Sequence, residues 1–372
     1  ISMRYYNTWA IKSDGTLWSW GRSGNDLNNG HTSSSISTPV QVGFEQQYTN
    51  ILSVSNTNYG FTKSPYSLSY LDLYGWGDNT YGQLGDGTTI FRSSPVLIST
   101  GVYKDMLFTN GTTTAVMTPS GLYMWGRNNY GQLGDGTTLN RSSPTLISTT
   151  IPGVISDRSI MSIGGDHVVA IRYSDNTIWS WGRNQYGQLG DGTTINKSSP
   201  VQVSTNSWYS VAAGDNHTAA VSGGGGLGSN IYAWGYNNYG QVGDGTTTNR
   251  SSPVLVGNPG GGTGWWYGLD CGSSHTLAVN NAGTIYAWGY NNYGQVGDGT
   301  TVNRSSPVAA SYSSGNGGYN AVAAGGDSSS IVSGGGVNIF TWGRNNNGQL
   351  GDGTTLNRSS PVAVYTSAVS YT

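Results

Sequence analysis

Three histidines share one slot of a repeated pattern, and they are the residues best suited to bind a metal. His167, His217 and His275 each precede a Trp-Gly pair at a similar distance, while His31 lies outside the pattern. Histidine nitrogens bind zinc at about 2 Å, so a zinc site would need the three rings to converge on one point. Equivalent positions of successive repeats lie much farther apart, so we predict no metal site.

The other repeats support a structural role for this slot. There we align it with other polar residues, namely Asn7, Tyr59, Thr112 and Ser328. A mixed polar slot is typical of side chains that hydrogen-bond a neighbouring turn.

Catalytic groups are sparse. Asp166 precedes His167, and Asp327 precedes Ser328 and Ser329, but triads are recognised by geometry and these residues belong to the repeat. Glu45 is the only glutamate, which excludes paired glutamates for glycoside hydrolysis and leaves aspartate pairs open. We therefore predict no catalytic residue, no cofactor and no enzyme activity.

The single cysteine gives no nucleophile either. Cys271 aligns with Ala213 and Ala324, just before a turn glycine, which predicts a small core residue.

Six Gly-Gln-(Leu/Val)-Gly-Asp-Gly-Thr segments look like phosphate-binding loops. Such a loop needs a strand before it and a helix after it, and no helical pattern follows any copy. A structural interpretation fits better, in which glycine allows positive φ, Asp caps its own turn, and Leu or Val fills the space between repeats.

Two positions near these segments are candidates for binding, because Tyr and Arg are common anchors in interfaces. One is a recurring tyrosine in the long turn and the other a variable residue after Trp-Gly. The candidate binding face comprises Tyr81, Tyr130, Tyr186, Tyr239, Tyr293, Arg127, Arg183, Tyr236, Tyr290 and Arg344. The alternative is that each tyrosine only packs on the next repeat. Irregular loops are further candidates, at residues 63–72, 147–156, 222–229, 257–264 and 312–318.

The elements that position these residues follow from the Trp-Gly pairs. Their tryptophans recur at nearly regular intervals, as Trp20, Trp76, Trp125, Trp181, Trp234, Trp288 and Trp342. A proline follows each of them at one constant distance, from Pro39 in the first repeat to Pro361 in the last. The segment after Trp342 and the segment up to Trp20 together equal one further interval. Seven repeats thus fill residues 1–372 as a single domain, and we expect the two ends to meet in one blade.

One repeat, read in detail, contains four short β-prone runs. They are residues 208–213, 218–221, 231–234 and 253–256, with a turn at residues 214–217. Proline at the start of the last run suits an edge strand. Four short strands in each repeat describe one propeller blade, so we predict an all-β fold, a closed seven-bladed propeller with four-stranded blades. A β-solenoid is the competing architecture.

Composition excludes several classes of function. The 372 residues include 59 glycines, only 9% are charged, and the net charge is −2. Ordinary domains carry about 25% charged residues, so no strong field exists here to attract nucleic acid. No apolar run reaches the length of a membrane-spanning helix, and we expect no insertion into membranes. The chain begins with Ile, which suggests a processed or excised segment.

The string Trp-Gly-x-Asn-x-x-Gly-Gln-Leu-Gly-Asp-Gly-Thr, with Gly-x-x-His before it and Pro-Val after it, resembles the repeat of the regulator of chromosome condensation family. The resemblance covers nearly the whole chain and implies a seven-bladed propeller. Family members include a nucleotide-exchange factor for a small GTPase, ubiquitin-ligase modules and bacterial or viral surface proteins, so the fold alone does not give the function.

Two functions follow as hypotheses. Few lysines, one glutamate and near-identical repeats resemble bacterial or phage surface members, which predicts a non-catalytic binding or decoration module. Its partner would be a protein assembly of a virion or cell surface, or a carbohydrate, and its location extracellular. The alternative is a guanine-nucleotide exchange factor or chromatin adaptor, with a cytoplasmic location as one option. Even the longest intervals between repeats, such as that from Trp20 to Trp76, leave no room for a large wedge on one blade, which disfavours the alternative.

Overall fold

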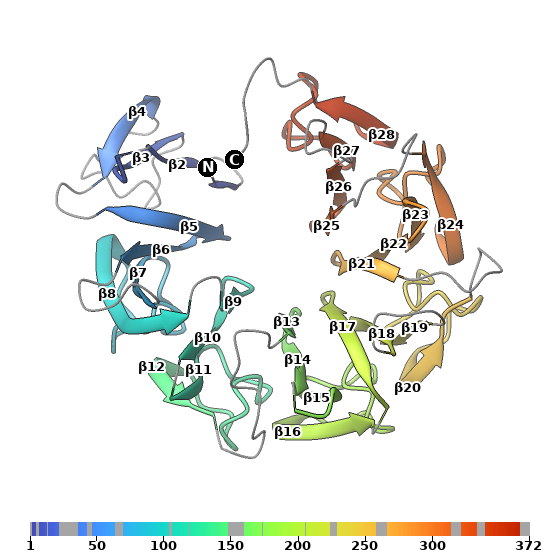
Figure 1. The fold of residues 1–372 in the computed structure, drawn as a ribbon, viewed down its shortest axis with the longest axis horizontal. Helices are drawn as coiled ribbons and strands as arrows, with labels where there is room; N and C mark the ends of the chain where they lie inside the picture. The colour runs from blue at the N-terminus through green and yellow to red at the C-terminus, as the bar shows by residue number, and fades with distance from the viewer. Residues whose placement is uncertain are drawn as a thin grey trace. The chain divides into compact units, whose positions relative to one another are not determined.

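The computed structural model describes most of the chain as short antiparallel strands (Figure 1). The described residues are 2–4, 7–12, 14–21, 36–42, 47–63, 70–103, 106–118, 120–147, 160–172, 174–204, 206–223, 229–257, 266–313, 321–332 and 339–364. Within these ranges the chain forms no helix, and hence none long and apolar enough to cross a membrane.

The chain divides into two compact units, Ile1–Arg158 and Ser159–Thr372. The first unit contains three four-stranded sheets. Their strands are β1 (Ser2–Arg4), β2 (Asn7–Ile11), β3 (Leu17–Gly21) and β4 (Ile36–Val42); β5 (Tyr48–Val54), β6 (Thr57–Lys63), β7 (Tyr70–Gly77) and β8 (Arg92–Tyr103); and β9 (Leu107–Thr109), β10 (Thr113–Thr118), β11 (Gly121–Gly126) and β12 (Arg141–Leu146).

The second unit contains four such sheets. They are β13 (Ile160–Ile163), β14 (His167–Arg172), β15 (Thr177–Gly182) and β16 (Lys197–Ser204); β17 (Trp208–Ala213), β18 (His217–Ser222), β19 (Ile231–Gly235) and β20 (Arg250–Leu255); β21 (Trp266–Cys271), β22 (His275–Asn280), β23 (Thr284–Gly289) and β24 (Arg304–Ser313); and β25 (Ala321–Ala324), β26 (Ser328–Val332), β27 (Ile339–Gly343) and β28 (Arg358–Val364).

Every sheet pairs its strands in chain order, so the predicted seven four-stranded blades are confirmed. Closure through the two ends stays a prediction, because residues 365–372 lie outside the described part. The N-terminal strand β1 occupies the innermost position of its sheet, as the repeat phase predicts.

The fourth strand starts earlier than the proline pattern predicts. In the fifth blade it begins at Arg250, three residues before Pro253. Among the described residues β20 pairs only with β19, so its other edge has no partner strand there and proline is tolerated inside the strand. The edge-strand assignment is confirmed, and the predicted starting residue is wrong.

The tryptophans of the Trp-Gly pairs form the core between blades. Six of them, from Trp76 to Trp342, have no exposed surface, and the side chain of Trp20 lies outside the described part. Cys271 is buried beside Trp288 in the cluster between the fifth and sixth blades, which confirms the prediction of a core residue.

Candidate functional site

The fixed string folds as a loop held by one buried asparagine. In the fifth blade Asn237 Nδ2 donates to the backbone oxygens of Thr246 and Thr248 at 3.1 and 3.0 Å. Its Oδ1 accepts the backbone N–H of Val242 at 2.9 Å. Val242 is fully buried, as are its counterparts Leu84, Leu133, Leu189 and Val296. The prediction of a structural loop is confirmed.

An aspartate in each loop completes this network. Arg250 binds Asp244 at 2.6 Å, and Thr246 donates both its backbone N–H and its hydroxyl to the same carboxylate. Burial opposes ionisation of Asp244, but the hydrogen bonds from Thr246 and Arg250 outweigh it and lower the pKa. The carboxylate is therefore ionised near pH 7 and stabilises the loop.

The strand register corrects part of the predicted histidine slot. His167, His217 and His275 each pair with the glycine of their own Trp-Gly, as do Asn7 and Ser328. In the second and third blades this partner is Thr57 and Thr113, so Tyr59 and Thr112 were wrongly aligned. The spacing misled because the hairpin after the slot, between the second and third strands, differs in length between repeats.

Each of the three histidines hydrogen-bonds a hydroxyl of the next blade. Nε2 of His217 lies 3.0 Å from Oγ1 of Thr276, and equivalent contacts join His167 to Thr218 and His275 to Ser329. Thr276 donates its one hydroxyl proton to the backbone oxygen of Gln241 at 3.0 Å. The hydroxyl must therefore accept from His217, so Nε2 of this ring carries a proton.

The network uses Nε2 of each of the three histidines, and their buried Nδ1 atoms have no hydrogen-bond partner among the described residues. Burial lowers the pKa of His167 and His217 to about 3 and that of His275 to about 4, so all three are neutral near pH 7. The described residues contain no group of three or more His, Cys, Asp or Glu placed to hold a metal ion. His31 lies outside the described residues.

Seven of the ten predicted binding residues form one continuous row in the second unit, which we call the tyrosine row. It runs in the order Arg183, Tyr186, Tyr236, Tyr239, Tyr290, Tyr293 and Arg344. Tilted pairs at 4.8 Å join neighbouring blades, and edge-on pairs at 6.0 and 6.1 Å lie within a blade. Each side chain is half-buried, so the rings both pack on the next blade and face solvent.

The remaining three residues form a shorter group in the first unit. The guanidinium of Arg127 lies 5.6 Å from the ring centre of Tyr81 and 5.9 Å from that of Tyr130. All three are half-buried. The two sequence positions, predicted separately as candidates, thus contact each other in both units.

The charges at the ends of the tyrosine row are paired. Arg183 lies 3.5 Å from Asp166, and Arg344 lies 3.2 Å from Asp327. Between them, burial and the neighbouring Tyr239 raise the pKa of Tyr236, and burial and Tyr293 raise that of Tyr290. The row is therefore a neutral aromatic surface flanked by two ion pairs.

The same loops carry exposed aliphatic residues in both units, and the sequence reasoning missed them. In five loops the residue directly after the Thr-Thr pair is aliphatic, and its side chain is 59 to 66% exposed. These residues are Ile90, Leu139, Ile195, Val302 and Leu356. In each loop the buried asparagine binds the backbone oxygen of this residue, which holds it in place. An apolar residue at one position of a polar loop was the signal that could have found them.

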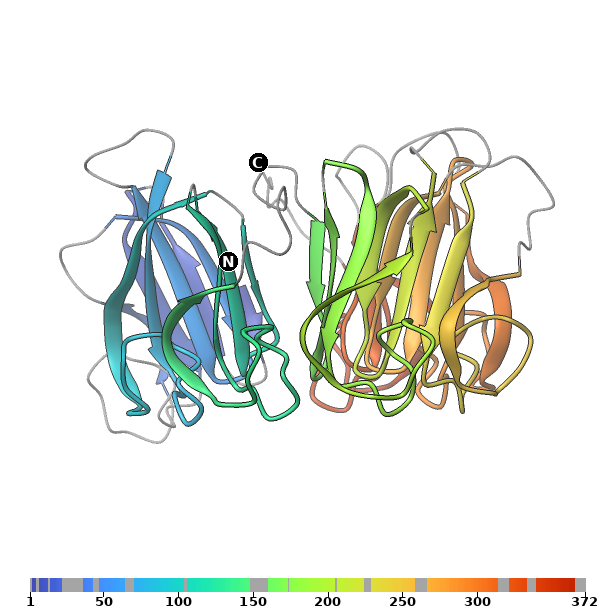
Figure 2. The ribbon, with the colours of Figure 1, turned by 90° about the horizontal axis from the view of Figure 1, so that it is seen from below.

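The predicted irregular loops lie mostly outside the described residues. In the second unit the strands that precede these loops end away from the tyrosine row, because the row follows third strands whereas these loops follow second or fourth strands. In the second unit the loops after the third strands gather at the lower end of the blades (Figure 2). Row and irregular loops are thus separate candidate surfaces.

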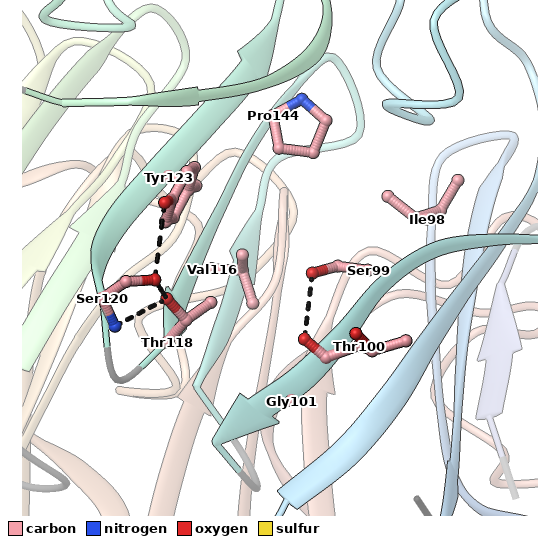
Figure 3. A pocket seen from close by; sticks show the side chains of 9 residues that line it. All are labelled: Ile98, Ser99, Thr100, Gly101, Val116, Thr118, Ser120, Tyr123 and Pro144. Carbon is pink, nitrogen blue, oxygen red and sulfur yellow. Dashed lines mark hydrogen bonds between the residues drawn. The ribbon is translucent and has the colours of Figure 1, made fainter.

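A groove of about 560 Å³ lies in the first unit between the second and third blades (Figure 3). Residues 98–101 of β8 form one wall, and β10, β11 and Pro144 form the rest. None of its lining residues was predicted from the sequence, because they come from two repeats.

Comparison with known proteins identifies the repeat. The profile described as regulator of chromosome condensation (RCC1) repeat matches residues 72–104, 120–171, 175–221, 229–279, 282–332 and 338–370. The chain is 29% identical over 361 residues to the ultraviolet-B receptor UVR8 of Arabidopsis thaliana, covering 95% of this chain and 79% of UVR8.

Two further comparisons concern the share of a relative that this chain covers and the fold. The chain is 30% identical over 216 residues to the probable E3 ubiquitin-protein ligase HERC4 of Homo sapiens, covering 56% of this chain and 20% of HERC4. It therefore spans only a fifth of that relative. The crystal structure of Prp20p from Saccharomyces cerevisiae matches with a TM-score of 0.72 at 18% identity, covering 98% of this chain and 91% of that one, which shows the propeller fold.

Proposed function

The chain belongs to the regulator of chromosome condensation (RCC1) repeat family, and from this premise we propose that it is a non-catalytic propeller that binds a protein partner. The described histidines and the loop aspartates are engaged in structural hydrogen bonds, which supports a role without catalysis. The ligase activity in the name of HERC4 is not carried over, because the match covers a fifth of that protein.

The tyrosine row is the observation that carries this proposal. Five tyrosine rings and two arginines stand half-exposed across four blades, and Tyr and Arg are enriched among residues that dominate binding energy. The rings are held by their neighbours, so little side-chain freedom is lost when a partner binds. The exposed aliphatic residues Ile195, Val302 and Leu356, on loops at the same end of the blades, add apolar surface.

The comparisons favour one class of partner. Prp20p is described by its binding to Gsp1p and to histones. This supports the alternative function, binding of a small GTPase or chromatin protein, better than decoration of a virion or cell surface. Exposure on a cell surface or virion, and carbohydrate binding by the row, are proposals from composition and aromatic content alone.

Substitution of Tyr186, Tyr239 and Tyr293 by serine tests the site. We expect the triple variant to lose binding to Gsp1p or to core histones in a titration by calorimetry, because three stacked rings leave the surface together. The control is Tyr209→Ser, at an exposed tyrosine of strand β17 away from the row. Retained binding in the triple variant would refute the row as the site, and a collapse of its melting temperature would assign the rings to packing alone.

Nucleotide exchange is the second candidate function, and its test differs. A GTPase loaded with fluorescent GDP should release it faster in the presence of the protein if the chain is an exchange factor. Binding without faster release would leave a protein-binding module and exclude exchange on that GTPase.

A further inference from the structure

Among the residues that the structure describes, the groove between the second and third blades has a neutral lining. Its nine lining residues include no Asp, Glu, Lys, Arg or His. The equivalent hairpin of the fourth blade carries the ion pair of Arg172 with Asp175, and another groove of about 540 Å³ in the first unit is lined by Lys12, Asp14 and Lys63. The absence of charge distinguishes this groove from the other groove of the first unit, and it disfavours phosphates, carboxylates and ammonium groups as ligands.

The groove offers apolar surface and hydroxyl groups together. Val116 is buried at its base, and Ile98, the ring of Pro144 and the ring of Tyr123 stand around it (Figure 3). Ser99 and Thr100 supply hydroxyls from the opposite wall. A ligand for such a surface needs both apolar faces and several neutral hydrogen-bonding groups.

The hydroxyls of the third blade are linked to one another. Oγ of Ser120 lies 2.9 Å from Oγ1 of Thr118 and 3.4 Å from the phenol oxygen of Tyr123. The hydroxyl of Thr118 also donates a hydrogen bond to the backbone oxygen of Gly121 at 3.3 Å. Each hydroxyl has one proton and two lone pairs, so this linked set retains acceptor capacity toward a ligand with hydroxyl donors.

Gly101 keeps the end of the β8 wall open. Its φ is +73°, and no heavy atom lies within 4 Å of the position that a Cβ would take. Most side chains are strained at this φ, so glycine there leaves space that another residue would fill.

From these features we propose that this groove binds a neutral carbohydrate of one or two pyranose rings. A pyranose presents apolar C–H faces for Tyr123 and Pro144, and hydroxyls that can donate to the remaining lone pairs of Ser120, Tyr123 and Ser99. The volume lies within the range of about 300 to 1,000 Å³ found for ligand sites. The site is separate from the loop that carries Arg127 and Tyr130, because the Thr118–Gly121 hairpin and that loop lie at opposite ends of β11.

Methyl NMR of the full chain tests the proposal directly. Glucose, galactose, N-acetylglucosamine and cellobiose are titrated while the methyl signals of Ile98, Val116 and Thr118 are followed. At least one of these sugars should shift all three signals and saturate. Tyr123→Phe, which keeps the ring and removes the hydroxyl, should weaken binding about two- to tenfold, whereas the matched Tyr286→Phe of the sixth blade should not change it.

A blocking variant separates the groove from surface adsorption. Thr100→Trp, at an exposed position of β8, should abolish the shifts while leaving the melting temperature unchanged. Absence of shifts with all four sugars, or shifts that persist in Thr100→Trp, would overturn the proposal. Tighter binding of an uncharged Ser- and Thr-rich peptide than of any sugar would assign the groove to a polypeptide instead.

Discussion

At the scale of single residues, polar side chains in this protein are shared between blades. The hydroxyl of Thr276 accepts from His217 and donates to Gln241, and the indole N–H of Trp288 donates to the same Gln241 oxygen at 2.9 Å. One buried backbone oxygen is thereby bound by two donors of the next blade. Each partner is needed, since a buried polar group left unpaired costs about 1–3 kcal/mol.

The neutral histidines predict a dependence of stability on pH. Their folded pKa values of about 3 to 4 lie below the value of about 6.5 expected in the unfolded chain. The unfolded chain therefore binds more protons below pH 6.5, so this stability is fully present above pH 6.5 and is lost as the pH falls toward 4. We expect the melting temperature to decrease between pH 7 and pH 4.5.

A variant is needed to isolate the histidine contribution, because two buried aspartates change the pH dependence of stability in the opposite direction. Burial raises the pKa of Asp215 and Asp270, which favours the folded state as the pH falls. His217→Leu should be less stable at pH 7 but lose less of its unfolding free energy on acidification than the original protein. Equal pH slopes for the two proteins would contradict the assignment.

At the scale of elements, the long loop of one blade is shaped to fit the tryptophan of the next. A Cβ added to Gly243 would lie 2.6 Å from the indole nitrogen of Trp288, and the φ of Gly243 is +77°. Gly245, two residues later, has a φ of +83° and its nearest atom is 3.6 Å away. The two glycines share a backbone conformation and differ in crowding.

Alanine at these two glycines should therefore have unequal effects. Gly245→Ala should lower the unfolding free energy by about 1–2 kcal/mol, the cost of a left-handed residue. Gly243→Ala should cost about 1–3 kcal/mol more, since the core tryptophan must also move. Denaturant titration of both variants measures the difference, and equal losses would show that the junction between blades is looser than its geometry indicates.

At the scale of the whole molecule, the two ends of the blades differ. The described loops after the third strands of the second to seventh blades repeat one hydrogen-bonded network, while the connections at the other end vary in length and composition. A constant end suits a continuous surface such as the tyrosine row. A variable end suits sites that belong to one blade pair, such as the groove beside β8.

Ring closure gives a prediction at the same scale. Residues 368–372 share the repeat phase of the innermost strand, and β1 fills that position in the first blade. We expect removal of residues 366–372 to lower the melting temperature, because a strand edge would lose its partner. Removal of residues 371–372 alone is the control and should have a smaller effect. An unchanged melting temperature in the longer deletion would contradict closure through the C-terminal segment.

The sequence by itself predicted most of the architecture. Spacing between Trp-Gly pairs gave seven blades, and residues 208–213 were assigned to a strand whose bounds the structure reproduces. The loop glycines, the buried Leu or Val and the core role of Cys271 followed from local rules on φ, turns and side-chain size. These features depend on contacts within one repeat or on a sequence pattern that recurs along the chain.

Only the tertiary structure decided how residues of different repeats combine. Tyr186 and Tyr236 belong to different repeats, yet their rings lie 4.8 Å apart because the blades pack side by side. The groove joins Thr100 of one blade with Tyr123 of the next, and the slot of Thr57 and Thr113 depends on strand register. No spacing rule within a repeat encodes the distance between two blades, since packing of the buried tryptophans sets it.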